Sequence, residues 1–114
     1  MSVQVGIQDQ FQRLAPERQV EIIYHGAALR LNELNQRYFL AQSKVRAYET
    51  QYQTTLVALD RAGLPADASV EMHEEYVLWH HWSTVVAETQ TAIAQLRPLV
   101  EQGLPLGALQ HERA

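Results

Sequence analysis

Cysteine is missing altogether from this 114-residue sequence. Its absence excludes disulfide frameworks, thiolate catalysis, Cys-ligated zinc and iron–sulfur clusters. Long apolar runs are missing too, because no stretch approaches the roughly 18 consecutive apolar residues of a membrane-spanning helix. Residues 1–10 show neither the basic region nor the apolar core of a signal peptide. We therefore expect a cytoplasmic protein that has no membrane partner.

Basic residues are scarce in the second half of the chain. Residues 1–62 carry seven basic and six acidic side chains, whereas residues 63–114 carry two basic and seven acidic ones. No lysine or arginine lies between Asp67 and Glu88. A net charge of −4 does not favour nucleic-acid binding. Either the acidic half attracts the other half of the same chain, or it meets a basic partner.

Glycine and proline divide the chain into helical segments. Gly63-Leu64-Pro65 and Gly103-Leu104-Pro105 each combine a left-handed glycine with a proline that cannot continue a helix. Pro16 fits a first helical turn, and Asp67 and Ser69 are candidate N-caps. The pattern predicts one domain with a short helix at about 3–14, long helices at about 16–62 and 69–102, and a tail at 103–114.

Both long segments carry an apolar stripe whose spacing alternates between three and four residues. This heptad pattern keeps one face of a helix against a partner helix. The predicted seam contains Leu31, Leu34, Tyr38, Val45, Tyr48, Tyr52, Thr55 and Leu59 in the first helix, and Met72, Glu75, Trp79, Trp82, Val86, Thr89 and Ile93 in the second. We predict an all-α, coiled-coil-like antiparallel hairpin. Gly26 is a weak point, and Pro98 predicts a kink or an early end near Leu96.

The apolar residues outnumber what a lone hairpin can bury. Each fully buried side chain contributes roughly 1.5–3 kcal/mol, whereas ordering each residue costs about 1–2 kcal/mol. More apolar residues flank the seams: Phe39, Leu40, Leu56, Tyr76, Val77, Leu78 and Val85. We predict a homodimer that closes a four-helix bundle, or a stable complex with another protein. The alternative is a monomer whose N-terminal segment covers the face.

Histidines and carboxylates gather in the segment from Glu71 to His81, which raises the question of a metal site. Imidazole and carboxylate groups are ligands for zinc and other transition metals. The segment lacks the His-x3-His, His-Glu-x-x-His and Glu-x-x-His spacings. We interpret it as a solvated acidic helix start, and we expect no metal and no cofactor.

A helical RNA-cleaving enzyme is a further alternative. Arg18 and His25 have six residues between them, and such a pair can protonate a leaving group and stabilise a phosphorane. The spacing is unspecific, and the acidic balance of the chain opposes RNA binding. An exposed arginine and a partly buried histidine near a helix start explain the pair better, and we expect no enzymatic activity.

Residues 31–82 resemble small helical antitoxin-like proteins of bacterial toxin–antitoxin gene pairs. The resemblance rests on three motifs: Tyr48-Glu49-Thr50-Gln51-Tyr52, Gly63-Leu64-Pro65-Ala66-Asp67-Ala68, and the run from Glu71 to Trp79 with Trp82 beyond it. Residues 31–82 make up just under half of the chain. Residues 1–23 have no counterpart in this pattern.

The resemblance implies a cytoplasmic antitoxin-like subunit that covers the basic active cleft of a toxin enzyme. The partner-binding residues that we expect on this basis are Glu71, His73, Glu74, Tyr76, Trp79 and Trp82. Aromatic side chains would anchor the interface, and carboxylates would steer association. No basic recognition helix is present, so we expect no direct binding to DNA. The alternative is a homodimeric structural, assembly or adaptor protein.

Overall fold

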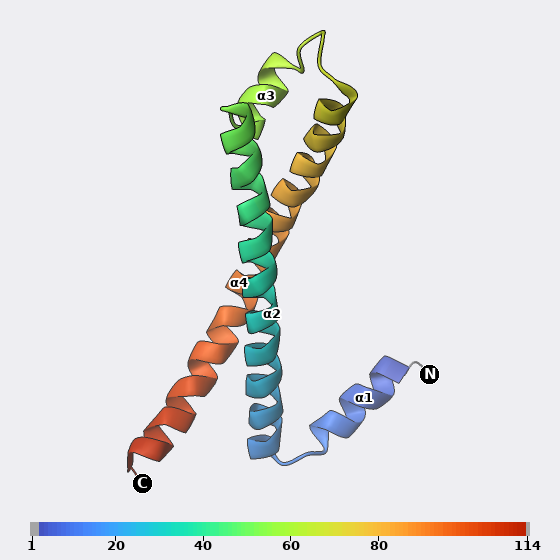
Figure 1. Ribbon diagram of the computed structural model, residues 1–114. Coiled ribbons are helices and arrows are strands. Elements are labelled where there is room, and N and C mark those ends of the chain that lie inside the picture. The colour runs from blue at the N-terminus through green and yellow to red at the C-terminus, as the bar shows by residue number, and fades with distance from the viewer. Residues whose placement is uncertain (1–2, 114) are drawn as a thin grey trace. The chain divides into compact units, whose positions relative to one another are not determined.

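The computed structural model describes residues 3–113 of the chain and the side-chain surroundings of residues 6–102. Its elements are α1 (Val3–Gln12), α2 (Pro16–Tyr52), α3 (Leu56–Ala62) and α4 (Val70–Arg113) (Figure 1). The two long helices, α2 and α4, pack against each other, with α3 between them in the sequence. The predicted all-α helical hairpin is therefore confirmed.

Two compact units divide the chain. Residues 33–93 form one, which we call the hairpin unit, and residues 1–32 together with 94–114 form the other, which we call the terminal unit. The hairpin unit contains the second part of α2, all of α3 and the first part of α4. The terminal unit contains α1 and the remaining parts of the two long helices.

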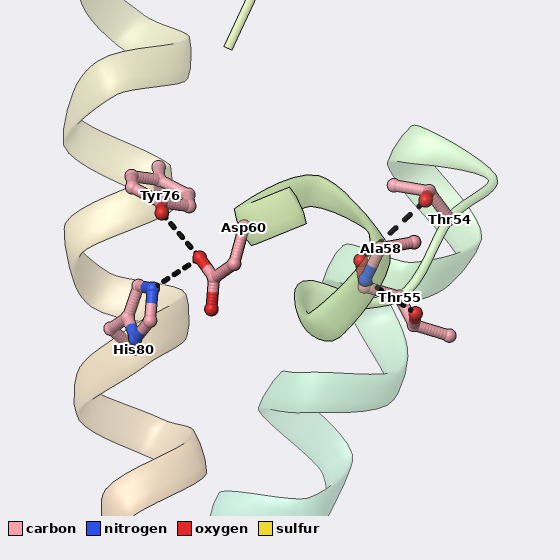
Figure 2. Close-up of polar contacts among 6 residues, drawn as sticks. All are labelled: Thr54, Thr55, Ala58, Asp60, Tyr76 and His80. Atoms are coloured by element: carbon pink, nitrogen blue, oxygen red, sulfur yellow. Dashed lines mark hydrogen bonds and ion pairs between the residues drawn. The ribbon is translucent and has the colours of Figure 1, made fainter. Parts of the chain in front are cut away.

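The predicted helix over residues 16–62 is wrong in one respect, because it is interrupted between α2 and α3. Gln53 has a left-handed backbone with a φ of 53°, which ends α2. Thr55 has an extended backbone, and its side chain accepts a hydrogen bond from the Ala58 N–H at 3.2 Å, so it is the N-cap of α3 (Figure 2). A threonine hydroxyl competes for backbone donors in this way, which favours a helix start. Thr55 is accordingly exposed and not part of the seam.

The predicted boundaries around the α3–α4 loop are confirmed. Gly63 adopts a φ of 78° and a ψ of 162°, and its N–H donates to the Leu59 carbonyl at 2.7 Å. A side chain at this backbone geometry would be strained, so glycine suits the position. Ser69 caps α4, since its Oγ accepts a hydrogen bond from the Met72 N–H at 3.0 Å.

Helix α4 extends further than the sequence pattern predicts. It continues through Pro98, Gly103 and Pro105 to Arg113, so the early end near Leu96, the end near residue 102 and the separate tail at 103–114 are wrong. Likewise, α2 passes through Gly26 without a break. A glycine costs about 1 kcal/mol and a proline about 3 kcal/mol in a helix interior. Neither cost ends the helix in which it occurs.

The core of the hairpin unit lies along the predicted seam. Its buried apolar side chains are Leu34, Leu59, Trp79 and Ile93 of the seam, together with Ala41 and with Val85, which was predicted to flank the seam. Thr89 is buried beside them, and its hydroxyl donates to the Val85 carbonyl at 2.7 Å. Apart from the exposed Thr55, the other seam residues of this unit are half-buried: Tyr38, Val45, Tyr48, Tyr52, Met72, Glu75, Trp82 and Val86. The seam is thus filled largely by packing within one chain.

The terminal unit has little core of its own among its described side chains. Ala27 is buried, and the unit's half-buried apolar side chains are Phe11, Tyr24, Ala28, Leu31, Leu96 and Val100. Gln19 secures the turn between α1 and α2, because its Nε2 donates to the Leu14 carbonyl at 2.8 Å. Ile7 of α1 nevertheless remains 63% exposed. No helix in the described part of the chain is both long and apolar enough to cross a membrane.

Candidate functional site

The first three turns of α4 carry most of the residues that the sequence singles out for binding. The Ser69 cap fixes where the helix begins, and Glu71 lies in its first turn, where a negative charge interacts favourably with the helix dipole. Because side chains three and four apart share a face of a helix, this start determines which residues point toward α2 and α3 and which point outward.

Trp79 lies on the inward side and is completely buried. Its ring is stacked on Tyr48, with centroids 5.7 Å apart, and on Tyr52, with centroids 6.0 Å apart. The indole N–H makes no hydrogen bond with the described residues, so its desolvation is offset by apolar burial and ring contacts instead. Trp79 therefore belongs to the core of the hairpin and offers no surface to a partner in this conformation.

Glu75 closes the aromatic cluster from the side of α4. The Tyr52 hydroxyl donates a hydrogen bond to its Oε2, and the Gln51 Nε2 donates to the same oxygen at 2.9 Å. The hydrogen bond to Glu75, together with burial, raises the pKa of Tyr52 to about 12. The half-buried carboxylate of Glu75 is thus engaged within the chain and ties the end of α2 to α4.

A second polar contact ties α3 to α4. Figure 2 shows the Asp60 carboxylate between Tyr76 and His80. The Tyr76 hydroxyl donates to Asp60 Oδ1, and the Nε2 of His80 lies 2.8 Å from the same oxygen. The two rings meet edge to face, with centroids 4.8 Å apart. Tyr76 and His80 lower the pKa of Asp60, in that order of importance, and the bond to Asp60 raises the pKa of Tyr76.

The chemistry of this Asp60 cluster is that of a structural tie. A carboxylate–histidine pair can serve as a general base, but the nearest hydroxyl, on Tyr76, already donates to the carboxylate. Asp60 and His80 are 39% and 45% exposed, so solvent screens their attraction. The cluster instead fixes the orientation of α3 against the first turns of α4.

The opposite side of these turns faces solvent, and we call it the outer face of α4. Its exposed residues are Val70, Glu71, His73, Glu74, Val77, Leu78 and His81. Val70 is 74% exposed and Val77 is 66% exposed, although both are apolar. The outer face therefore combines apolar side chains with carboxylates, and no lysine or arginine occurs between residues 67 and 88.

The structure divides the six predicted partner-binding residues among three environments. Glu71, His73 and Glu74 are exposed on the outer face. Tyr76 is half-buried and bonded to Asp60, and Trp82 is half-buried beside the His81 ring, 5.1 Å away. Trp79 is completely buried. Only the first group, the two glutamates and His73, is freely accessible to another protein.

The sequence pattern did not identify Asp60 and His80 as partners of Tyr76, or Val70 as part of the outer face of α4. The four-residue spacing of Tyr76 and His80 already places them on one face of a helix. Asp60, however, reaches them through the fold, from a position 16 residues before Tyr76. The spacing of seven residues between Val70 and Val77 could have predicted that both lie on the same face of the helix.

The remaining candidates are the Arg18–His25 pair and the possible metal ligands. Arg18 and His25 are both exposed on α2, two helical turns apart, and the His25 ring contacts the ring of Tyr24 with centroids 5.4 Å apart. Across the described residues, no three histidine, aspartate or glutamate side chains are grouped so as to hold a metal ion. The outer face of α4 is consequently the best-defined candidate site.

Comparison of the chain with protein-family models, with curated proteins and with solved structures finds no match. The candidate site is therefore interpreted from its own geometry and charge.

Proposed function

We propose that the chain is a non-enzymatic binding module whose outer face of α4 docks onto a basic, partly apolar surface of another protein. The proposal rests mainly on one observation: exposed Val70 and Val77 lie on the same helix face as exposed Glu71 and Glu74. Burying the apolar side chains supplies affinity, at about 25 cal/mol per Å² removed from water. The carboxylates increase the rate of encounter with a basic surface and select against acidic ones.

The resemblance of residues 31–82 to antitoxin-like proteins supports a specific role for this face. In that role the chain neutralises a toxin enzyme by covering its active cleft. A cleft that acts on RNA is lined with lysine and arginine, since it must bind phosphates, and an acidic helix face complements it. The proposal assumes a cytoplasmic location, which a cysteine-free sequence favours.

The contacts behind the outer face support the proposal as well. Asp60 ties α3 to Tyr76 and His80, while Glu75 ties α4 to Tyr52. Helix α4 is thus braced on its inner side over the same turns that carry the exposed glutamates. A face that is rigid before binding loses less conformational entropy on binding.

A homodimeric structural or adaptor protein is the second candidate function. It is favoured by the exposed apolar side chains of the terminal unit, such as Val20 and Ile23, which the chain itself leaves uncovered. In this role the outer face of α4 would remain free on both copies. The two functions are compatible, since they use different parts of the chain.

The proposed function is tested by co-expression with the genes adjacent to this one. A partner toxin arrests growth when expressed alone, and the chain restores growth. The double variant Glu71→Lys/Glu74→Lys should lose this rescue, because reversed charges on the outer face repel a basic cleft. Binding of the purified partner, measured by calorimetry, should weaken at least about tenfold, as like-charge contacts in an interface cost several kcal/mol.

The matched control is Glu21→Lys/Glu101→Lys, which makes the same change of charge at two exposed positions of the terminal unit. It should retain both rescue and binding. The proposal fails if both double variants behave alike, or if no adjacent gene product arrests growth and binds the chain. Helix content by circular dichroism checks that each variant is folded.

A further inference from the structure

The terminal unit exposes an apolar stripe that continues the seam of the hairpin. Val20, Ile23 and Ala27 follow the spacing of three and four that leads on to Leu31 and Leu34. Leu34 and Ala27 are buried, but Val20 is 45% exposed and Ile23 is 43% exposed. The stripe is therefore of the kind that packs against a helix, and toward the start of α2 its side chains are only partly covered by the described residues.

Exposure of this stripe leaves the terminal unit with little apolar burial to offset the entropy cost of ordering its backbone. The hairpin unit buries six apolar side chains, whereas the terminal unit buries Ala27 alone among its described side chains. Ordering the backbone costs about 1–2 kcal/mol per residue in either unit. Among the side chains of the terminal unit that the structure describes, seven large apolar ones stay exposed: Ile7, Leu14, Val20, Ile22, Ile23, Leu29 and Leu99. A second surface that covers the stripe would supply the burial that the unit lacks.

The net charges of the two units indicate which surface covers the stripe. The terminal unit holds five acidic and five basic residues, a net charge of zero, while the hairpin unit holds eight acidic and four basic residues, a net charge of −4. Two copies that met through their hairpin units would bring two charges of −4 together. Two copies that met through their terminal units would meet without net repulsion. The apolar, neutral unit is thus suited to a second copy of itself.

We infer that two copies of the chain associate through their terminal units, with Val20 and Ile23 of each α2 and Leu99 of each α4 in a shared core. The interface is isologous, so each copy contributes the same stripe and closes the other's incomplete core. Specific interfaces use about 20–30 residues on each side, which a unit built from residues 1–32 and 94–114 provides. The outer face of α4 lies in the hairpin unit and stays available for the basic partner.

Light scattering after size exclusion tests the inference on the full chain over a concentration series. The wild-type chain should have twice the monomer mass of 13.0 kDa. Val20→Glu/Ile23→Glu should halve that mass while circular dichroism still reports helix, because both positions are already partly exposed. The control Phe39→Glu/Val57→Glu places the same charges at exposed apolar positions of the hairpin unit and should keep the doubled mass.

A wild-type chain that is monomeric at every concentration overturns the inference. So does a dimer that survives the terminal-unit substitutions but is lost in the control. Hydrogen exchange of the wild-type chain gives a test that needs no variant: dilution through the dimer-to-monomer transition should accelerate exchange in residues 16–32 and leave residues 70–88 unchanged. Acceleration confined to residues 70–88 would place the interface in the hairpin unit and overturn the inference. The variant Val20→Glu/Ile23→Glu should still rescue growth, because it leaves the outer face of α4 unchanged. Loss of the dimer with rescue retained therefore separates this inference from the proposed function.

Discussion

The hairpin unit and the terminal unit are built from the same two long helices, yet they bury apolar surface very differently. The hairpin unit encloses Trp79 between Tyr48 and Tyr52 and adds two polar ties, at Glu75 and Asp60. The terminal unit continues the apolar stripe but leaves Val20 and Ile23 exposed. A continuous heptad pattern therefore does not guarantee a continuous core.

The side chains at the seam account for much of this difference. Large aromatic rings fill the space between α2 and α4 in the hairpin unit, and α3 contributes buried Leu59 to the same core. Near the start of α2 the buried seam residue is the small Ala27, with Gly26 beside it. The hairpin unit therefore buries more of its apolar side chains than the described part of the terminal unit does.

The largest expected effect is that of Trp79→Ala in the hairpin unit. Removing this fully buried ring should lower the free energy of unfolding by about 3–5 kcal/mol, since it leaves a cavity between two tyrosines. Urea denaturation followed by circular dichroism measures the change. Leu29→Ala, at a 64% exposed position of the terminal unit, should cost less than about 0.5 kcal/mol. Equal losses in the two variants would contradict the contrast between the units.

Gly63→Ala should have the next largest effect. Gly63 combines a φ of 78° with a ψ of 162°, a region that is essentially restricted to glycine. Alanine there should cost about 1–3 kcal/mol of stability through backbone strain, although no neighbouring atom lies within 4 Å of the added methyl group. The same denaturation experiment measures it. An unchanged midpoint would show that the α3–α4 loop relaxes without cost.

Tyr52→Phe probes the tie to Glu75, and its expected cost is about 1 kcal/mol for one lost hydrogen bond. The pKa of Tyr52 is raised from 10.0 to about 12, so its contribution is fully present below pH 10 and is lost as the pH rises toward 12. Ultraviolet absorbance should show a late phenolate transition whose amplitude falls in the variant without vanishing, because the pKa of Tyr76 is raised as well. An unchanged amplitude would show that Tyr52 does not contribute to it. Tyr24→Phe in the terminal unit is the matched control.

Gly26→Ala should have the smallest effect, and it should be stabilising. Gly26 lies inside α2, and no neighbouring atom lies within 4 Å of an added methyl group. Alanine should raise the stability by about 0.5–1 kcal/mol through helix propensity alone. A thermal melt measures the shift. Destabilisation would reveal a close approach at this position, for example by the second copy, and would move the inferred interface to that side of α2.

Sequence periodicity predicted the architecture well because burial in a hairpin follows the spacing of side chains along each helix. Leu34, Leu59 and Ile93 were all assigned to the seam, and all are buried. The boundaries were predicted less well. The break at Gln53 and the extension of α4 beyond Pro98 depend on small local free energies, about 1–3 kcal/mol each, that a pattern of apolar residues does not report.

The candidate site was predictable only in part. Acidic residues without compensating lysine or arginine marked Glu71 and Glu74, and both lie on the exposed face. The burial of Trp79 and the tie from Asp60 arise from contacts between helices that are distant in sequence. An aromatic residue beside charged ones was interpreted as an interface anchor, but the same residue equally suits the core, and only the fold distinguishes the two.

Residue-resolved hydrogen exchange of the dilute, monomeric chain tests the division into two units most directly. Exchange rates report the free energy of opening at each amide. The account predicts the slowest exchange around Ala41, Trp79 and Val85 in the hairpin unit, and markedly faster exchange over residues 16–30. Equal protection along the whole of α2 and α4, or the slowest amides within residues 16–30, would contradict it.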